Sequence, residues 1–180
     1  AGASKYVARR ETPVFLAENC TQCMECITIC PDTALPNTAQ DLDTVLGAAI
    51  SGYVTDKGDK DRLLAALPTL QALIRESMNE AVAEKDSRSL ASIVAEHLER
   101  LEDVSAASRA EISTLLMQLP LAYGKARGIF AQREKKNPGD GGVFSIFVSD
   151  LCKGCAACDP GRHSSGSSTK CADCPVGGDS

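Results

Sequence analysis

Apolar residues between positions 38 and 136 recur every three to four places, which is the period of an amphipathic helix. The clearest of these runs extends from Leu90 to Leu101. A further helix is expected from about Leu121 to Lys135, before a Lys-Asn-Pro-Gly stop signal. Short amphipathic helices bury their apolar faces most simply against one another, so this region is predicted to form a small helical bundle.

The expected starts of these helices depend on the residue types that begin them. Thr38 can cap the first helix, and Pro68 suits the first turn of the next. The segment 55–59 is expected to separate these two helices. The sequence Ser108-Arg109-Ala110-Glu111 has the form of a capping box, which predicts another helix start.

Two apolar stretches outside this region precede clusters of cysteine. Residues 12–18 (TPVFLAE) and 143–150 (VFSIFVSD) are each predicted to form a strand. Each is followed within two residues by a Cys-x-x-Cys-x-x-Cys run, and residues 32–37 after the first run are turn-forming. Strand, acidic residue and three cysteines therefore recur in the same order, which indicates two similar halves separated by the helices.

The first cysteine run, CTQCMECITICP, contains Cys20, Cys23, Cys26 and Cys30, and Pro31 follows. This is the bacterial ferredoxin spacing for a [4Fe–4S] cluster, in which the fourth cysteine normally ligates the other cluster of a pair. Each iron of the cube needs one thiolate. A short loop with two-residue gaps brings successive sulfurs to neighbouring irons, while intervening N–H groups point at the inorganic sulfides.

The second run is shorter and consists of Cys152, Cys155 and Cys158. By the cross-over rule, Cys30 would supply its fourth ligand. The equivalent cysteine of the second half is missing, because Arg162 stands at its position. The first cluster therefore needs a thiolate from the tail, where Cys174, which precedes Pro175, is the first choice and Cys171 is in reserve.

Two other uses of the tail cysteines remain open. Cys155, Cys158, Cys171 and Cys174 form CxxC-x12-CxxC, which is similar to a zinc ribbon with a slightly short spacer. Alternatively, the tail cysteines bind nothing. A disulfide framework is disfavoured, since nine cysteines are an odd number and no apolar signal segment precedes them.

Composition and charge argue against a nucleic-acid-binding protein and against a membrane-anchored one. The chain has 19 Lys plus Arg against 24 Asp plus Glu, which leaves no basic field for nucleic acid and no polybasic membrane anchor. No apolar run approaches the length of a membrane span. Nine thiols without a signal segment predict a cytoplasmic protein. The chain starts without Met, so we expect a processed chain or a piece of a longer polypeptide.

The segments ENCTQCMECITICPDTALPNTAQDL and FVSDLCKGCAAC resemble the dicluster ferredoxin domain of the 2-oxoacid:ferredoxin oxidoreductases, the pyruvate:ferredoxin oxidoreductase group. The resemblance covers roughly residues 12–42 and 143–158. It implies an α+β fold, with a ferredoxin-like core for two [4Fe–4S] clusters and a long inserted α-helical region. The expected halves of the core are 12–42 and 139–180, the latter with a flexible tail, and the insertion is 43–138. The ligands that it implies are Cys20, Cys23, Cys26, Cys30, Cys152, Cys155 and Cys158, with Arg162 leaving the eighth ligand open.

The same resemblance implies an electron-transfer module. In this family a thiamine diphosphate enzyme oxidatively decarboxylates a 2-oxoacid with coenzyme A, and electrons leave through [4Fe–4S] clusters to external ferredoxin or flavodoxin. Thiamine diphosphate, Mg and coenzyme A would belong only to the catalytic domains or subunits that partner this chain. Two alternatives are a helical dicluster subunit, as in succinate dehydrogenase, and a structural or interaction module braced by a cluster or by zinc.

Overall fold

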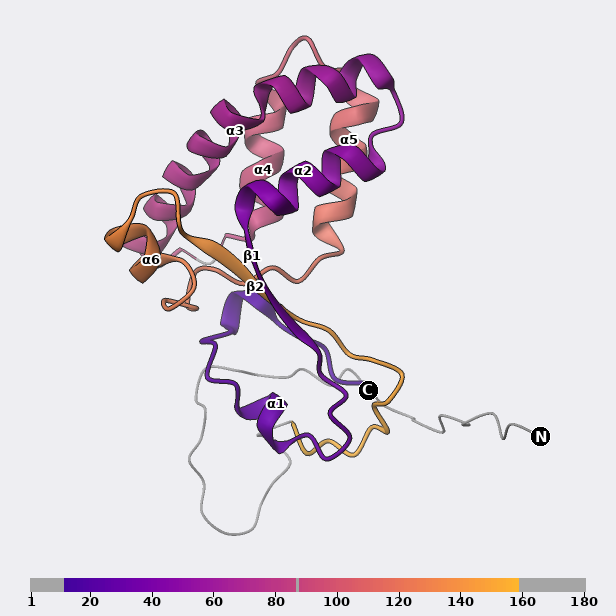
Figure 1. The fold of residues 1–180 in the computed structure, drawn as a ribbon, viewed down its shortest axis with the longest axis vertical. Coiled ribbons are helices and arrows are strands. Elements are labelled where there is room, and N and C mark those ends of the chain that lie inside the picture. Colours follow the sequence, from indigo (N-terminus) through magenta and orange to yellow (C-terminus); the bar gives the residue numbers. More distant parts are fainter. Residues whose placement is uncertain (1–11, 87, 159–180) are drawn as a thin grey trace, which may run out of the picture.

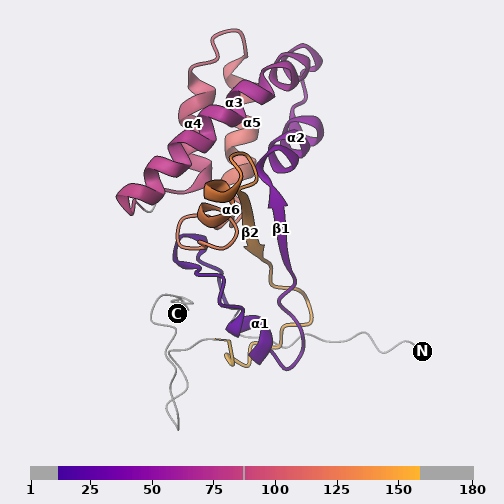
Figure 2. The same ribbon diagram turned by 60° about the vertical axis from the view of Figure 1, so that its left-hand side comes forward.

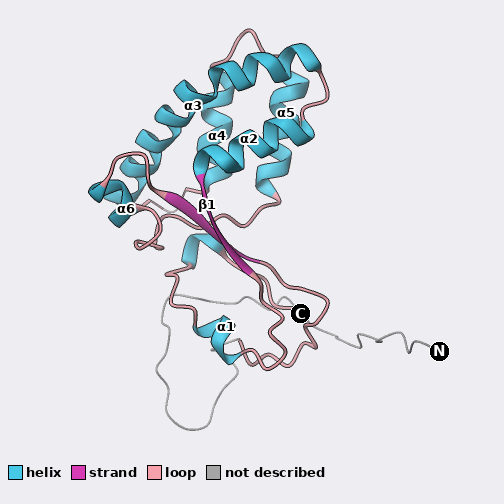
Figure 3. Ribbon diagram, in the orientation of Figure 1, coloured by secondary structure: helices cyan, strands magenta, loops and turns pink. Residues whose placement is uncertain are grey.

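The computed structural model describes residues 12–86 and 88–158, and these residues form an α+β fold (Figures 1 and 3). In chain order the elements are the 3-10 turn η1 (Ala17–Asn19), α1 (Glu25–Ile29), β1 (Asn37–Asp41), α2 (Leu42–Tyr53), α3 (Lys57–Glu84), α4 (Leu90–Glu99), α5 (Ala106–Met117), α6 (Ala131–Lys136) and β2 (Gly142–Ile146). Among the described helices, none combines the length and the apolar character that crossing a membrane requires.

The two strands pair antiparallel and form a ribbon through the middle of the molecule. Their register runs from Asn37 opposite Ile146 to Asp41 opposite Gly142. The pairing continues beyond the strands, because Phe147 N–H donates to the Pro36 carbonyl oxygen at 2.8 Å and Ser149 N–H donates to the Ala34 carbonyl oxygen at 2.9 Å. The ribbon therefore joins the segment that follows the first cysteine run to the segment that precedes the second.

The helices and the cysteine loops lie at opposite ends of this ribbon. Helix α2 begins directly where β1 ends, and α2, α3, α4 and α5 gather at that end, whereas α1 and the loop of residues 150–158 lie at the other end (Figures 1 and 2). The helical region is thus inserted at the tip of an antiparallel ribbon. Because of this arrangement, α2–α5 do not cover the cysteine loops.

The predicted helical bundle is confirmed for α2–α5. Helix α3 packs against α2 and α4, and α5 packs against α2 and α4. Their buried faces supply most of the large side chains that are fully enclosed, which include Leu42, Leu46, Ile50, Leu63, Ile74, Met78, Leu90, Ile93, Leu98 and Ile112. With no Trp and few other aromatic residues in the chain, these aliphatic side chains provide the driving force for folding.

The starts of three helices differ from the predictions. Thr38 lies inside β1, so it does not cap a helix, and Asp41 precedes α2 instead. Pro68 lies in the interior of the 28-residue helix α3, where Leu64, whose carbonyl loses its helical partner, is 37% exposed. The N-cap of helix α5 is Ser105, three residues before the predicted cap Ser108, because the Ser105 hydroxyl accepts the Ser108 N–H.

The predicted strands are also only partly present. Residues 12–18 form no strand and end in η1, whereas the second predicted strand is present but shorter, as β2. The helix predicted from Leu121 to Lys135 is reduced to α6. The reason is tertiary, since Ala122 pairs with Phe144 in an isolated antiparallel bridge and cannot also be helical.

Candidate metal centre

The first cysteine loop wraps around α1. Cys20 follows η1 and is buried, Cys23 is exposed, and Cys26 and Cys30 are partly buried. Helix α1 contains Cys26 and ends one residue before Cys30. One short helix therefore places the last two sulfurs of the run at its two ends.

The second loop repeats the backbone conformation of the first. Gln22 and Met24, the second and fourth residues after Cys20, have left-handed φ values of 62° and 66°. Gly154 and Ala156, the second and fourth residues after Cys152, have φ values of 68° and 58°. A left-handed conformation costs a residue other than glycine roughly 1–2 kcal/mol, so three of these four positions are strained. The internal repeat in the sequence is thus a repeat in backbone geometry.

Backbone N–H groups point at two of the cysteine sulfurs. Gln22 N–H donates to Cys20 Sγ at 3.4 Å, and Ala34 N–H donates to Cys30 Sγ at 3.3 Å. Such bonds favour the thiolate over the thiol, and they tune metal clusters held by thiolates.

Cys30 lies with the second cysteine run, although it belongs to the first by sequence. A small cavity of about 20 Å³ is lined by the four cysteines Cys30, Cys152, Cys155 and Cys158. Its other walls include Ala34 and Leu35, which are both buried. Burial raises the pKa of the Cys158 thiol, and nearby Cys152, Cys30 and Cys155 raise it further. Four thiols that were predicted to serve one cluster therefore share one partly apolar environment.

An ion pair crosses between the two loops beside this cavity. Lys153 Nζ lies 2.8 Å from Asp32 Oδ1. The hydrogen bond to Asp32 raises the pKa of Lys153. Lys153 directly follows Cys152 and Asp32 follows Pro31, so the pair ties the end of one cysteine run to the start of the other. The sequence offered no signal for this contact, because two opposite charges are informative only once their loops are known to face each other.

The predicted tail ligands Cys174 and Cys171, and Arg162 at the position of the missing cysteine, lie outside the described residues. Among residues 12–86 and 88–158, no three side chains of His, Cys, Asp or Glu are gathered closely enough to hold a metal ion. No disulfide joins the seven cysteines of these ranges.

Comparison of the chain with protein-family models, with curated protein sequences and with solved structures found no match.

Proposed function

We propose that this chain is an electron-transfer module that carries two [4Fe–4S] clusters on a ferredoxin-like core. The ligands of one cluster are Cys152, Cys155, Cys158 and Cys30. The ligands of the other are Cys20, Cys23, Cys26 and a tail cysteine, Cys174 in preference to Cys171. The parent system that fits the resemblance is a thiamine diphosphate-dependent 2-oxoacid:ferredoxin oxidoreductase, and the chain would pass electrons from its catalytic partner to external ferredoxin or flavodoxin.

The observation that supports this proposal most strongly is the position of Cys30. A ferredoxin-type pair of clusters requires the last cysteine of one run to serve the other run. Cys30 lines the same cavity as Cys152, Cys155 and Cys158. A zinc ribbon built from CxxC pairs gives no reason for a cysteine of the first run to lie there.

The strained loops support the same proposal. Left-handed residues other than glycine persist where something over-determines the backbone, and they concentrate at ligand sites. Here they recur at equivalent places in two loops that have the same cysteine spacing. Sulfur-directed N–H groups at Cys20 and Cys30 fit bound thiolates as well.

The size of the group matters for comparing the geometry with a cluster. The ligand sulfurs of a single zinc ion all lie about 2.3 Å from it, and so they nearly touch one another. Four thiolates at the corners of an iron–sulfur cube are held farther apart. Cysteines that line one cavity without converging on a point are therefore not arranged around a single zinc ion, and the cavity of about 20 Å³, which has room for roughly one water, would have to widen to admit a cube.

The chemistry that each bound cluster supplies is the uptake and release of one electron without making or breaking a bond. The residues of this chain hold the cube through thiolates and adjust its potential through N–H···S bonds and burial. Ala34 and Leu35 exclude water from one side of the cavity that Cys30 shares. The free-energy difference between the oxidised and the reduced cluster, and hence its reduction potential, depends on these surroundings.

Anaerobic analysis of iron, sulfide and zinc in the purified chain tests the proposal. Two cubes require about eight irons and no zinc per chain. About four irons with one zinc would instead indicate the mixed site with Cys171 and Cys174. A folded chain that is colourless and free of iron when protected from oxygen would contradict the proposal.

A second measurement tests electron transfer itself. The chain is reduced anaerobically and mixed with oxidised ferredoxin or flavodoxin, and the absorbance of both proteins is followed. We expect the clusters to be reoxidised as the acceptor is reduced. If the reduced chain has its full iron content but transfers no electrons to either acceptor, the result would favour a structural module braced by its clusters.

A further inference from the structure

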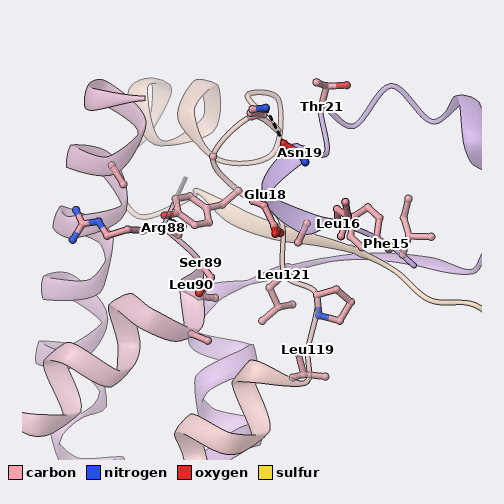
Figure 4. A pocket seen from close by; sticks show the side chains of 18 of the residues that line it. Phe15, Leu16, Glu18, Asn19, Thr21, Arg88, Ser89, Leu90, Leu119 and Leu121 are labelled. Carbon is pink, nitrogen blue, oxygen red and sulfur yellow. Dashed lines mark hydrogen bonds between the residues drawn. The ribbon is translucent and has the colours of Figure 1, made fainter. Parts of the chain in front are cut away.

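A cavity of about 1580 Å³ lies between the ribbon and the bundle, and no described cysteine lines it, although Asn19 and Thr21 on either side of Cys20 do. Residues 13–19 form one wall, and the connection between α3 and α4 together with residues 116–121 forms another. Phe15, Leu16, Leu119 and Leu121 supply apolar surface, whereas Arg88, Glu18 and Asn19 are polar (Figure 4). The third wall is the end of the second strand, at Ile146, Phe147 and Val148.

In this third wall, the backbone N–H and C=O groups of successive residues point alternately toward β1 and away from it. Phe147 and Ser149 donate toward the β1 side, to Pro36 and Ala34. Phe144 faces the opposite side, where it exchanges hydrogen bonds of 2.7 and 2.9 Å with Ala122. By the alternation of an antiparallel strand, Ile146 and Val148 also direct their N–H and C=O groups away from β1, on the side of Ala122.

Nothing in the described chain continues the pairing on that side. If the Ala122–Phe144 pairing continued, Pro120 would lie opposite Ile146. Pro120 has no N–H, and its carbonyl oxygen already accepts the Ser145 hydroxyl at 2.7 Å. Among the described residues, no backbone hydrogen bond joins Ile146 or Val148 to a segment on that side. Ile146 is nevertheless only 4% exposed, and buried backbone groups require a partner. The strand edge is therefore open where it borders the cavity.

The charges around the cavity favour an acidic occupant. Four basic residues line it, Lys85, Arg88, Lys125 and Arg127, against two acidic ones, Glu18 and Asp86. Asp86 and Arg88 pair with each other at 2.6 Å, which leaves Lys85, Lys125 and Arg127 against Glu18. This excess of positive charge contrasts with the formal net charge of −5 for the whole chain.

We propose that the open edge at Ile146–Val148 binds an extended, acidic segment of a partner protein, which adds to β2 as a further strand. Main-chain hydrogen bonds to Ile146 and Val148 would provide affinity, and the apolar walls would receive alternate side chains. The carboxylates would face the basic residues at the mouth. Residues 1–11 of this chain are an unsuitable occupant because they carry Lys5, Arg9 and Arg10 against only Glu11. The proposal does not depend on the metal content of the cysteine loops.

A peptide probe tests this proposal with the full chain, purified anaerobically. The probe is a fluorescent heptapeptide of alternating Val and Thr with Asp and Glu at its ends, and binding is followed by fluorescence anisotropy. Methylation of alternate backbone nitrogens removes the donors on one edge of the probe and is expected to weaken binding at least about tenfold. Replacing the acids with Lys is also expected to weaken binding, and more so at low salt.

Protein variants provide the complementary test. Val148→Pro removes an N–H that faces the cavity and leaves the hydrogen bond between Phe147 and Pro36 in place. It should therefore weaken binding of the probe several-fold, whereas Val148→Ala, which keeps the N–H, should not. Arg127→Glu should weaken binding, and Arg133→Glu, on an exposed site of α6, should not. Far-UV circular dichroism checks that each variant is folded.

Three outcomes would overturn the proposal. One is a probe affinity that changes neither with N-methylation of the probe nor with its charge. Another is the absence of any binding at millimolar probe. The third is slow hydrogen exchange of the Ile146 and Val148 amides in the free chain, which would mean that a segment of the chain itself closes the edge.

Discussion

Cys30 shows at the scale of one residue how the two halves of the chain are connected. Its Sγ accepts the N–H of Ala34 and lines the cavity of Cys152, Cys155 and Cys158. Pro31 and Asp32 then turn the chain toward β1, and Asp32 holds Lys153 across the gap. A few side chains at the end of one run thus fix its position against the other run.

Substitution of Cys30 tests the assignment of ligands. In the proposed assignment Cys30 is a ligand of the cluster of the second run, so Cys30→Ser should lower the iron content from about eight to about four per chain and leave the cluster of Cys20, Cys23 and Cys26 in place. Anaerobic iron analysis with electron paramagnetic resonance of the reduced chain measures both effects. Cys171→Ser is the control, since Cys174 is the preferred tail ligand, and it should retain all the iron. Full iron content in Cys30→Ser would contradict the assignment.

The Lys153–Asp32 pair allows a prediction about the redox potential. Reduction adds negative charge to a cluster, so removing the neighbouring positive charge should disfavour the reduced form. Lys153→Ala is expected to lower the potential of one cluster on the order of 20 mV, a small effect because the Lys153 side chain is 73% exposed and water screens it. A redox titration at low salt measures the shift, and Lys153→Arg, which keeps the charge, should not show it. Equal shifts in both variants would mean that loop geometry, not charge, is responsible.

At the scale of secondary structure, Asp59 links the starts of two helices. It lies in the first turn of α3, and its carboxylate accepts the Ser105 N–H at 3.1 Å and the Ser108 hydroxyl at 2.8 Å from the start of α5. Arg62 adds an ion pair at 2.7 Å. Hydrogen bonds from Ser105 and Ser108 lower the pKa of Asp59 from 3.8 to about 2. The charged form of Asp59 is therefore the one that the bundle stabilises.

This pKa shift predicts how bundle stability depends on pH. The folded pKa lies below the unfolded value, so the stabilisation is fully present above pH 3.8 and is lost as the pH falls toward 2. Asp59→Asn should lower the urea midpoint at neutral pH, and its difference from the parent chain should shrink at about pH 3. Helical circular dichroism during urea unfolding measures this, with Asp61→Asn, an exposed site on the same helix, as the control. A pH-independent difference would show that the charge of Asp59 is not what matters.

For the whole molecule, the ribbon separates two ends of different character. The bundle end buries a continuous aliphatic core, including Leu46, Ile74 and Leu98. The cysteine end has few buried side chains and three strained residues other than glycine in its two loops. We therefore infer that the bundle folds on its own apolar contacts, while the cysteine loops depend on what the thiolates hold.

Removal of metal should affect the two ends differently. After treatment with chelator and oxidant, the visible absorption of the chain should disappear, while most of the helical circular dichroism is retained, because α2–α5 pack mainly against one another. Amide exchange at Gln22, Met24 and Ala156 should become fast, since the strained turns lose their support. Untreated chain kept anaerobic is the control. Simultaneous loss of colour and helix would contradict the separation of the two ends.

Features that depend on the spacing of neighbouring residues could be predicted from the sequence. The period of apolar residues predicted the bundle helices, because residues three or four apart share a helix face whatever the rest of the chain does. The cysteine spacing likewise predicted two equivalent loops, and their matching left-handed residues agree with that. The identity of the bound group stays a prediction from this spacing.

Which segments far apart in the sequence contact each other became known only from the tertiary structure. Thr38 is a good helix cap, yet it lies in a strand because Ser145 lies opposite it. Residues 12–18 have strand-forming composition, yet no described segment pairs with them, and they border a cavity instead. Strand pairing depends on a partner far along the chain, and a single sequence carries no direct signal of that partner. For the same reason, the contact of Lys153 with Asp32 and the open edge at Ile146 became visible only when the ribbon had brought those segments together.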